Sequence, residues 1–123
     1  MNIIIRDVEY ELATTLRVAY NIQGQHNHKP YSEIFEQVGE MGIEDQVGII
    51  WAAFQAANPD MSKIIGRTGF TDDYLDRYNL TDLMNHLKGV VEGILGKSMD
   101  DKQEQSEAED ENFQKEPGMT SLE

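Results

Sequence analysis

The chain contains no cysteine among its 123 residues. This absence excludes a disulfide framework, a thiolate metal site and a thiol nucleophile, and it suits a reducing compartment such as the cytoplasm. A long apolar run is also missing at the N-terminus, where Ile3-Ile4-Ile5 is followed at once by Arg6 and Asp7. Such a run is far too short for a signal peptide or a membrane helix, so we expect neither.

Positive charge is scarce as well. Ten lysines and arginines face 23 acidic residues, which gives a formal net charge of -13. Nucleic-acid phosphates and anionic membrane surfaces repel a chain of this charge, so we expect no nucleic acid and no membrane among its partners. The length fits one domain with a modest core.

The acidic residues are concentrated at one end of the chain. From Ser98 to Glu123, nine acidic residues face two lysines, and Phe113 is the one aromatic residue of this segment. Such a composition cannot bury enough apolar surface to offset roughly 1 to 2 kcal/mol of backbone entropy per ordered residue. We therefore expect a folded domain over residues 1–97 and a disordered acidic tail over residues 98–123.

The start of the chain predicts a β-hairpin. A two-residue turn at positions 6–7 places Ile5 opposite Val8 and Ile3 opposite Tyr10, so that the apolar side chains share one face. A longer or bulged turn stays open, because Arg-Asp lacks the glycine that two-residue turns favour. A two-stranded hairpin is marginally stable alone, so it must pack on helices or pair with another chain.

Short helices are predicted around the polar loop at residues 25–30 and late in the chain. Their expected extents are residues 15–24 behind a threonine cap, residues 32–38 with Ser32 as the cap, and residues 71–78 with Thr71 as the cap. Met61 to Ile65 is expected to form an apolar turn, and Gly66 to Gly69 a second turn.

Two longer amphipathic helices are predicted by apolar residues that recur at spacings of three and four. The first begins at Ile43, ends before Asn58-Pro59 and is expected to form the centre of the core. The second runs from Leu80 to Leu95, with Thr81 as a candidate cap.

Gly89 and Gly93 interrupt this last pattern at a cost of about 1 kcal/mol each relative to alanine. Close approach of a neighbouring backbone at Gly89, Gly93 and Gly96, and simple tolerance of glycine in a surface turn, both stay open as explanations. The patterns together predict a mainly α fold, with an N-terminal β-hairpin followed by a compact bundle of four to five helices and a disordered acidic C-terminal tail.

Residues with catalytic or metal-binding chemistry form no recognisable motif. His26 and His28 lack a further ligand at a suitable spacing, so a solvated polar loop is favoured over a metal site. The acids of residues 1–97 fall mostly on the expected solvent faces of helices, where an acid and base pair has no special environment. Phosphate-binding loops and nucleophile motifs are missing. We expect no enzyme activity, no cofactor and no metal.

The order of parts resembles a known family. The segment from Ile3 to Leu12, followed by Thr15-Leu16-Arg17, is similar to the opening of tail assembly chaperones from long-tailed, siphovirus-type bacteriophages or prophages of Gram-positive bacteria. The helix from Gly48 to Ala57, its end at Asn58-Pro59-Asp60 and the late amphipathic helix extend the resemblance over roughly residues 1–97.

The resemblance implies a protein that binds the long helical tape-measure protein, keeps it soluble and helps recruit tail-tube protein during tail assembly. It also implies action in the host cytoplasm and absence from the mature virion. Exposed parts of the two long apolar stripes are then expected to bind the partner. The candidate partner-binding residues are Ile50, Trp51, Phe54, Leu83, Leu87, Val91 and Leu95. Self-association into a homo-oligomer through a strand edge stays open.

An acidic inhibitor that imitates nucleic acid, and occupies the basic cleft of a DNA-processing enzyme, is the alternative function. It requires a continuous acidic strip on the folded domain, whereas more than half of the net charge lies in residues 98–123. An enzyme ranks third, because no catalytic constellation is present.

We predict that a chain ending at Lys97 keeps the fold, because the deleted segment has little apolar surface to contribute to a core. Thermal unfolding followed by circular dichroism should show one cooperative transition in the full chain and in the truncated chain. Loss of that transition on truncation would move the domain boundary.

Overall fold

The computed structural model describes residues 1–96, and the predicted acidic tail over residues 98–123 lies outside the described residues. The elements follow one another as β1 (Asn2–Ile5), β2 (Val8–Glu11), α1 (Leu16–Gln25), α2 (Tyr31–Glu36), the 3-10 helix η1 (Val38–Glu40), α3 (Ile43–Ala57), α4 (Pro59–Arg77) and α5 (Leu80–Leu95). The predicted fold class, mainly α with an N-terminal β-hairpin before a bundle of helices, is confirmed.

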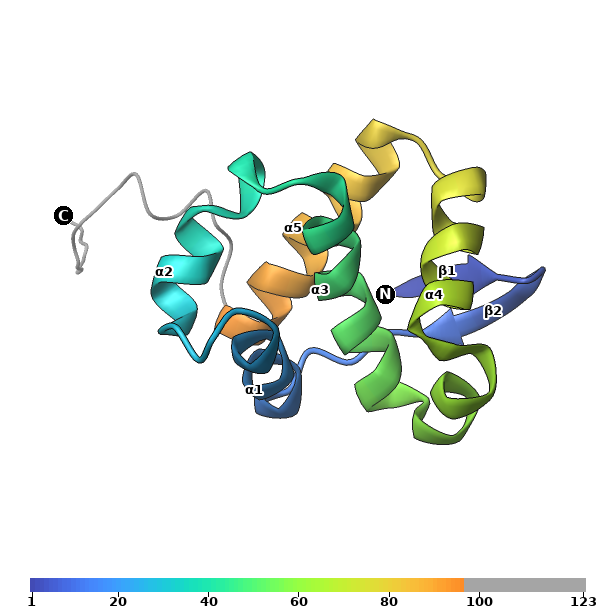
Figure 1. The fold of residues 1–123 in the computed structure, drawn as a ribbon, viewed down its shortest axis with the longest axis horizontal. Coiled ribbons are helices and arrows are strands. Elements are labelled where there is room, and N and C mark those ends of the chain that lie inside the picture. The colour runs from blue at the N-terminus through green and yellow to red at the C-terminus, as the bar shows by residue number, and fades with distance from the viewer. Residues whose placement is uncertain (97–123) are drawn as a thin grey trace, which may run out of the picture.

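Helix α3 forms the centre of the core, as its sequence predicts. Every residue from Gln46 to Phe54 is buried, so the helix is enclosed on all sides along this stretch. Its neighbours are α1, α4, α5 and β2. Figure 1 shows α3 running through the middle of the molecule, with α4 and the hairpin on one side and α1 on the other. A helix that is apolar all round is stable in water only when other elements cover it.

Aromatic side chains join three of these elements. The ring centroid of Phe54 on α3 lies 5.2 Å from that of Tyr10 on β2 and 4.9 Å from that of Phe70 on α4. Trp51 lies 5.3 Å from Phe70. Contacts of this kind contribute about 0.5 to 1.5 kcal/mol per pair beyond the burial of area. They hold the hairpin and α4 against the central helix.

The hairpin has the predicted register. Ile3 pairs with Tyr10 and Ile5 with Val8, which confirms the two-residue turn. Both turn residues have positive φ, 52° at position 6 and 66° at position 7, as a type I′ turn requires. Ile3 and Ile5 are buried, so one face of the hairpin belongs to the core.

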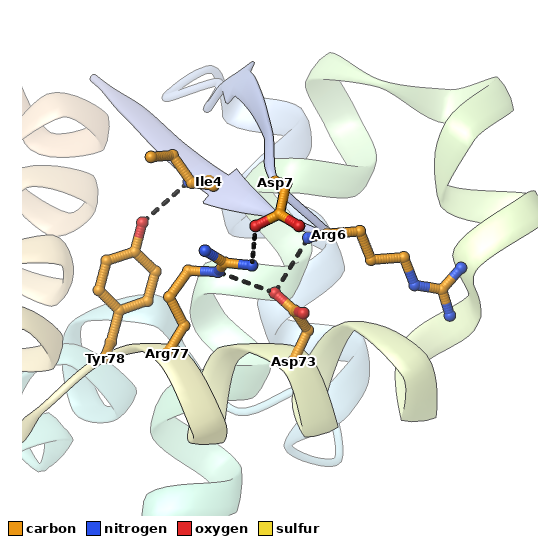
Figure 2. A network of polar contacts seen from close by, with 6 residues as sticks. All are labelled: Ile4, Arg6, Asp7, Asp73, Arg77 and Tyr78. Carbon is orange, nitrogen blue, oxygen red and sulfur yellow. Dashed lines mark hydrogen bonds and ion pairs between the residues drawn. The ribbon is translucent and has the colours of Figure 1, made fainter.

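The strained turn is held by α4, as Figure 2 shows. The backbone N–H of Arg6 donates to Oδ2 of Asp73 at 3.1 Å. Arg77 donates from Nε to the same oxygen at 3.1 Å and from Nη2 to Oδ1 of Asp7 at 3.2 Å. Partial burial raises the pKa of Asp73, but the bonds from Arg77 and Arg6 outweigh it and hold that pKa below its usual value. Surrounding contacts of this kind let residues with side chains occupy left-handed backbone positions.

Two predicted helix starts are wrong. Helix α2 begins at Tyr31 and not after Ser32, because the carbonyl of Pro30 already accepts the N–H groups of Glu33 and Ile34. The cap of α5 is Asn79 and not Thr81. The Asn79 side chain accepts the N–H of Asp82 at 2.9 Å, and Asp82 accepts the N–H of Asn79 at 3.2 Å, which is a capping box.

The segment between the two long helices is also more helical than predicted. Instead of two turns and a short helix capped by Thr71, α4 runs from Pro59 to Arg77 with one interruption at Gly66. Pro59 suits the first helical position, where its missing N–H leaves no bond unmade. The backbone of Gly66 has φ 76° and ψ 159°, so the helix axis changes direction there.

The two glycines inside α5 face close neighbours. A Cβ atom at Gly89 would overlap the side chain of Met1, and one at Gly93 would lie 2.7 Å from Cβ of Thr14. These neighbours are side chains of the N-terminal segment rather than another backbone. Close packing at Gly89 and Gly93 is therefore present, but the approach of a backbone is not found there, and an added Cβ at Gly96 would meet no atom within 4 Å.

Gly93→Ala should destabilise the fold by about 1 kcal/mol, because overpacking of about 1 to 3 kcal/mol outweighs a gain in helix propensity of about 1 kcal/mol. Gly24→Ala is the matched control, since Gly24 lies in α1 and a Cβ added there would meet no neighbouring atom within 4 Å. This control should stabilise the fold by about 0.5 to 1 kcal/mol. Urea denaturation of both variants measures the difference, and equal stabilisation by both would contradict the packing at Gly93.

Candidate protein-binding groove

The residues predicted to bind a partner lie mostly inside the core. Six of them are buried, and the seventh is half-buried and packs against the same core: Ile50, Trp51, Phe54, Leu83, Leu87, Val91 and Leu95. The stripes of α3 and α5 pack against each other, which leaves little of either stripe uncovered. In this conformation these side chains stabilise the helices, and direct contact between them and a partner stays a prediction.

Other apolar side chains of the same region are exposed. Ile43 at the start of α3 has 53% of its surface exposed, Leu75 on α4 has 49% and Leu80 at the start of α5 has 64%. Ile43 and Leu80 are the first residues of their helices, and Leu75 lies near the end of α4. Figure 1 shows the start of α3, the end of α4 and the start of α5 in the upper part of the view. Exposed apolar residues that gather at one site commonly mark a surface for another protein.

These residues line two adjoining hollows. The larger, of about 570 Å³, is lined by Ile43, Glu44, Arg67, Thr68, Thr71, Asp72 and Leu75. The smaller, of about 160 Å³, is lined by Ile43, Val47, Tyr74, Leu75, Tyr78, Asn79, Leu80 and Leu83. Ile43 and Leu75 belong to both, so the hollows form one depression, which we call the α3/α4/α5 groove.

The walls of the groove carry opposite charges in unequal number. Glu44 lies on the α3 wall and Asp72 on the α4 wall, while Arg67 is the one basic residue that lines the groove. A Cβ at Gly48 would lie 2.6 Å from Nη2 of Arg67, so the guanidinium of Arg67 is directed back onto α3. The domain as a whole has fourteen acidic and seven basic residues over positions 1–96, which makes its general field negative.

Two tyrosines form the floor of the smaller hollow, and both are tied down. The hydroxyl of Tyr74 lies 2.5 Å from Nδ1 of His86 on α5. Burial raises the pKa of Tyr74, and electrostatic interactions with Tyr78 and Asp82 add to this effect. The phenol of Tyr74 therefore stays protonated and can donate its proton to the ring of His86.

Tyr78 links the groove to the hairpin. Its hydroxyl accepts the backbone N–H of Ile4 at 2.8 Å, as Figure 2 shows, and its ring lies 4.8 Å from that of Tyr74. The groove floor, the loop between α4 and α5, and the first strand are therefore held as one unit.

Other kinds of site find less support in the described part of the chain. Over residues 1–96, no three His, Cys, Asp or Glu side chains are placed to hold a metal ion. A third hollow, lined by Asp73, Asp76 and Arg77, involves the ion pairs that secure the hairpin turn. Within the same residues, none of the helices combines the length and apolar character needed to cross a membrane.

Comparison with known proteins adds no identification. A scan against protein families, a search of curated proteins and a search of solved structures each found no match for this chain.

The groove residues were not singled out by their sequence pattern. Ile43 and Leu80 fall on the apolar stripes and read as core residues, although each begins a helix and lies beyond the covering elements. Leu75 lies next to the buried Tyr74, and nothing in the local pattern marks it as exposed. Position at a helix start is the signal that separates Ile43 and Leu80 from the buried members of their stripes.

We predict that stability falls as the pH decreases below 6.5, the ordinary pKa of imidazole. Burial lowers the pKa of His86 in the fold, against the opposing charge of Asp82. The unfolded chain therefore takes up a proton at this residue before the folded chain does, and stability is lost until the pH falls below the folded-state pKa.

Urea denaturation at a series of pH values between neutrality and mild acid measures this loss. His86→Gln should have a shallower dependence than the wild type, and His28→Gln, which alters an exposed loop residue, should keep the wild-type slope. Equal slopes in all three proteins would contradict the assignment.

Proposed function

We propose that this chain is a tail assembly chaperone of a long-tailed bacteriophage or prophage. On this proposal it binds the tape-measure protein, keeps it soluble and helps recruit tail-tube protein while the tail is built. It acts in the host cytoplasm as a binding protein and not as an enzyme, and it is left out of the mature virion.

The observation that carries the proposal is the α3/α4/α5 groove. Ile43, Leu75 and Leu80 are exposed around it and, unlike the other exposed apolar residues such as Leu16 and Ile64, they line one depression. A protein that holds a long amphipathic helix in solution needs an exposed apolar groove, since the apolar face of such a helix docks into one. The resemblance of residues 1–97 to tail assembly chaperones supplies the identity of the helical client.

The charge of the chain also supports a role in which many copies share one client. A formal net charge of -13 makes copies repel one another, which opposes aggregation when they are crowded along one helix. The same charge attracts basic regions of a partner and speeds encounter with them.

The test is co-expression of the full chain with the tape-measure protein of the same genome, followed by size-exclusion chromatography with light scattering. We expect a soluble complex that contains many copies of the chain per client. The client expressed alone, which should aggregate, is the control. An aggregated client in the presence of the chain contradicts the proposal.

A different outcome would favour the nucleic-acid mimic. Recovery of a basic DNA-processing enzyme whose binding weakens steeply with salt, without any soluble tape-measure complex, would move the assignment to an inhibitor.

A further inference from the structure

The α3/α4/α5 groove has the length of a short helix. One wall is the second half of α4, whose lining residues run from Arg67 to Tyr78 at its C-cap, a length of about 16 Å. The opposite wall is the first turns of α3, and Leu80 of α5 lies at the far end from Arg67. A bound helix of about three turns has the same length.

The exposed apolar residues of the groove are placed so that they can contact the apolar stripe of a bound helix. Ile43 lies on the α3 wall and Leu75 on the α4 wall, with buried Val47 and Leu83 beneath them in the smaller hollow. An apolar side chain that enters between the walls contacts both, and Leu80 extends this surface beyond the end of α4.

The charges beside these residues indicate the flanks of the bound helix. Glu44 and Asp72 place one carboxylate on each wall, whereas Arg67 lies at one end and is directed onto α3 at Gly48. A helix seated in the groove therefore has a carboxylate on both sides of its apolar stripe. Lysine or arginine on both flanks of the stripe complements this arrangement, and acidic residues there are repelled.

This charge pattern disfavours two other occupants. The chain's own segment from Ser98 to Glu123 has nine acidic residues and two lysines, so it would bring like charge to Glu44 and Asp72. A second copy of the domain presents twice as many acidic as basic residues over positions 1–96, which is unfavourable for the same reason.

We propose that the α3/α4/α5 groove binds a basic amphipathic α-helix of a partner protein, about three turns long. The apolar stripe of that helix packs on Ile43, Leu75 and Leu80, and its basic flanks lie beside Glu44 and Asp72. The inference deepens the proposed function and rests on it only for the identity of the natural client, the tape-measure protein.

The test uses a synthetic peptide and the full chain. The peptide is a fluorescein-labelled helix of about four turns, with leucines at i, i+4, i+7 and i+11, lysines on both flanks and alanines elsewhere. Fluorescence anisotropy should show saturable binding that weakens with salt. A peptide with glutamates in place of the lysines should bind at least about tenfold more weakly, because like charges then meet across the groove.

Three variants distinguish binding in the groove from nonspecific binding to exposed apolar residues elsewhere on the domain. Leu75→Gln and Leu80→Gln remove apolar surface from the groove while keeping a helix-favouring residue, and each should weaken binding by about tenfold. Ile64→Gln is the matched control, because Ile64 lies on the same helix as Leu75, is 72% exposed and does not line the groove. This control should bind like the wild type, and equal weakening in all three overturns the proposal.

A second pair of variants tests the charges. Glu44→Gln combined with Asp72→Asn should weaken binding of the lysine peptide and reduce its dependence on salt. Glu36→Gln combined with Asp60→Asn removes two exposed carboxylates elsewhere and should have a smaller effect. Equal effects of the two pairs would mean that the general negative field attracts the peptide, and that the groove charges do not select it.

Other occupants give distinct results, and each overturns the proposal. Peptide binding that appears only after deletion of residues 98–123 means that the chain's own tail fills the groove. A concentration-dependent dimer that Leu75→Gln dissociates means that a second copy does.

Failure of this inference and failure of the proposed function can be told apart. If the Leu75 and Leu80 variants keep the tape-measure protein soluble as well as the wild type does, the groove is not the client site although the chaperone function stands. If the lysine peptide binds the groove but no client is kept soluble, the groove stands and the chaperone function fails.

Discussion

Everything else in this domain depends on the burial of α3 on all sides. The stretch from Gln46 to Phe54 has no polar face to present to water, so β2, α1, α4 and α5 must all pack around it. This requirement explains why a chain with a modest core has one continuous apolar cluster. It also explains why the predicted binding residues Ile50, Trp51 and Phe54 are enclosed, since the same helix cannot be both the centre of the core and an open surface.

The groove forms at one end of this packing arrangement, where the helices no longer cover one another. Helices that cover a central helix diverge at their ends, and Ile43, Leu75 and Leu80 lie where α3, α4 and α5 separate. The polar contacts of Tyr78 with the hairpin, and of Tyr74 with His86, keep the floor in place beneath these exposed residues. Exposed apolar surface therefore arises without disturbing the core.

Local rules predicted the hairpin register and the two long helices well, because each depends on the alternation or periodicity of apolar residues in one segment. The prediction of the α5 start was wrong because two nearby side chains could each serve as the helix cap. Asn79 outcompetes Thr81 as a cap because Asp82 completes its capping box. The groove could not be predicted from pattern alone, because the exposure of Leu75 depends on where α3 begins in space.

Gly66 separates the two parts of α4 by a backbone conformation that residues with side chains hardly ever adopt. Uninterrupted, the 19 residues of α4 would form one straight helix of about 28 Å, in which both halves share one axis. The direction of the groove wall that α4 forms is thus set by the backbone of Gly66, which does not itself line the groove. Shape and chemistry of the groove can consequently vary independently. Changes at the lining residues alter its polarity and charge, whereas a change at Gly66 alters the direction of the wall that α4 forms.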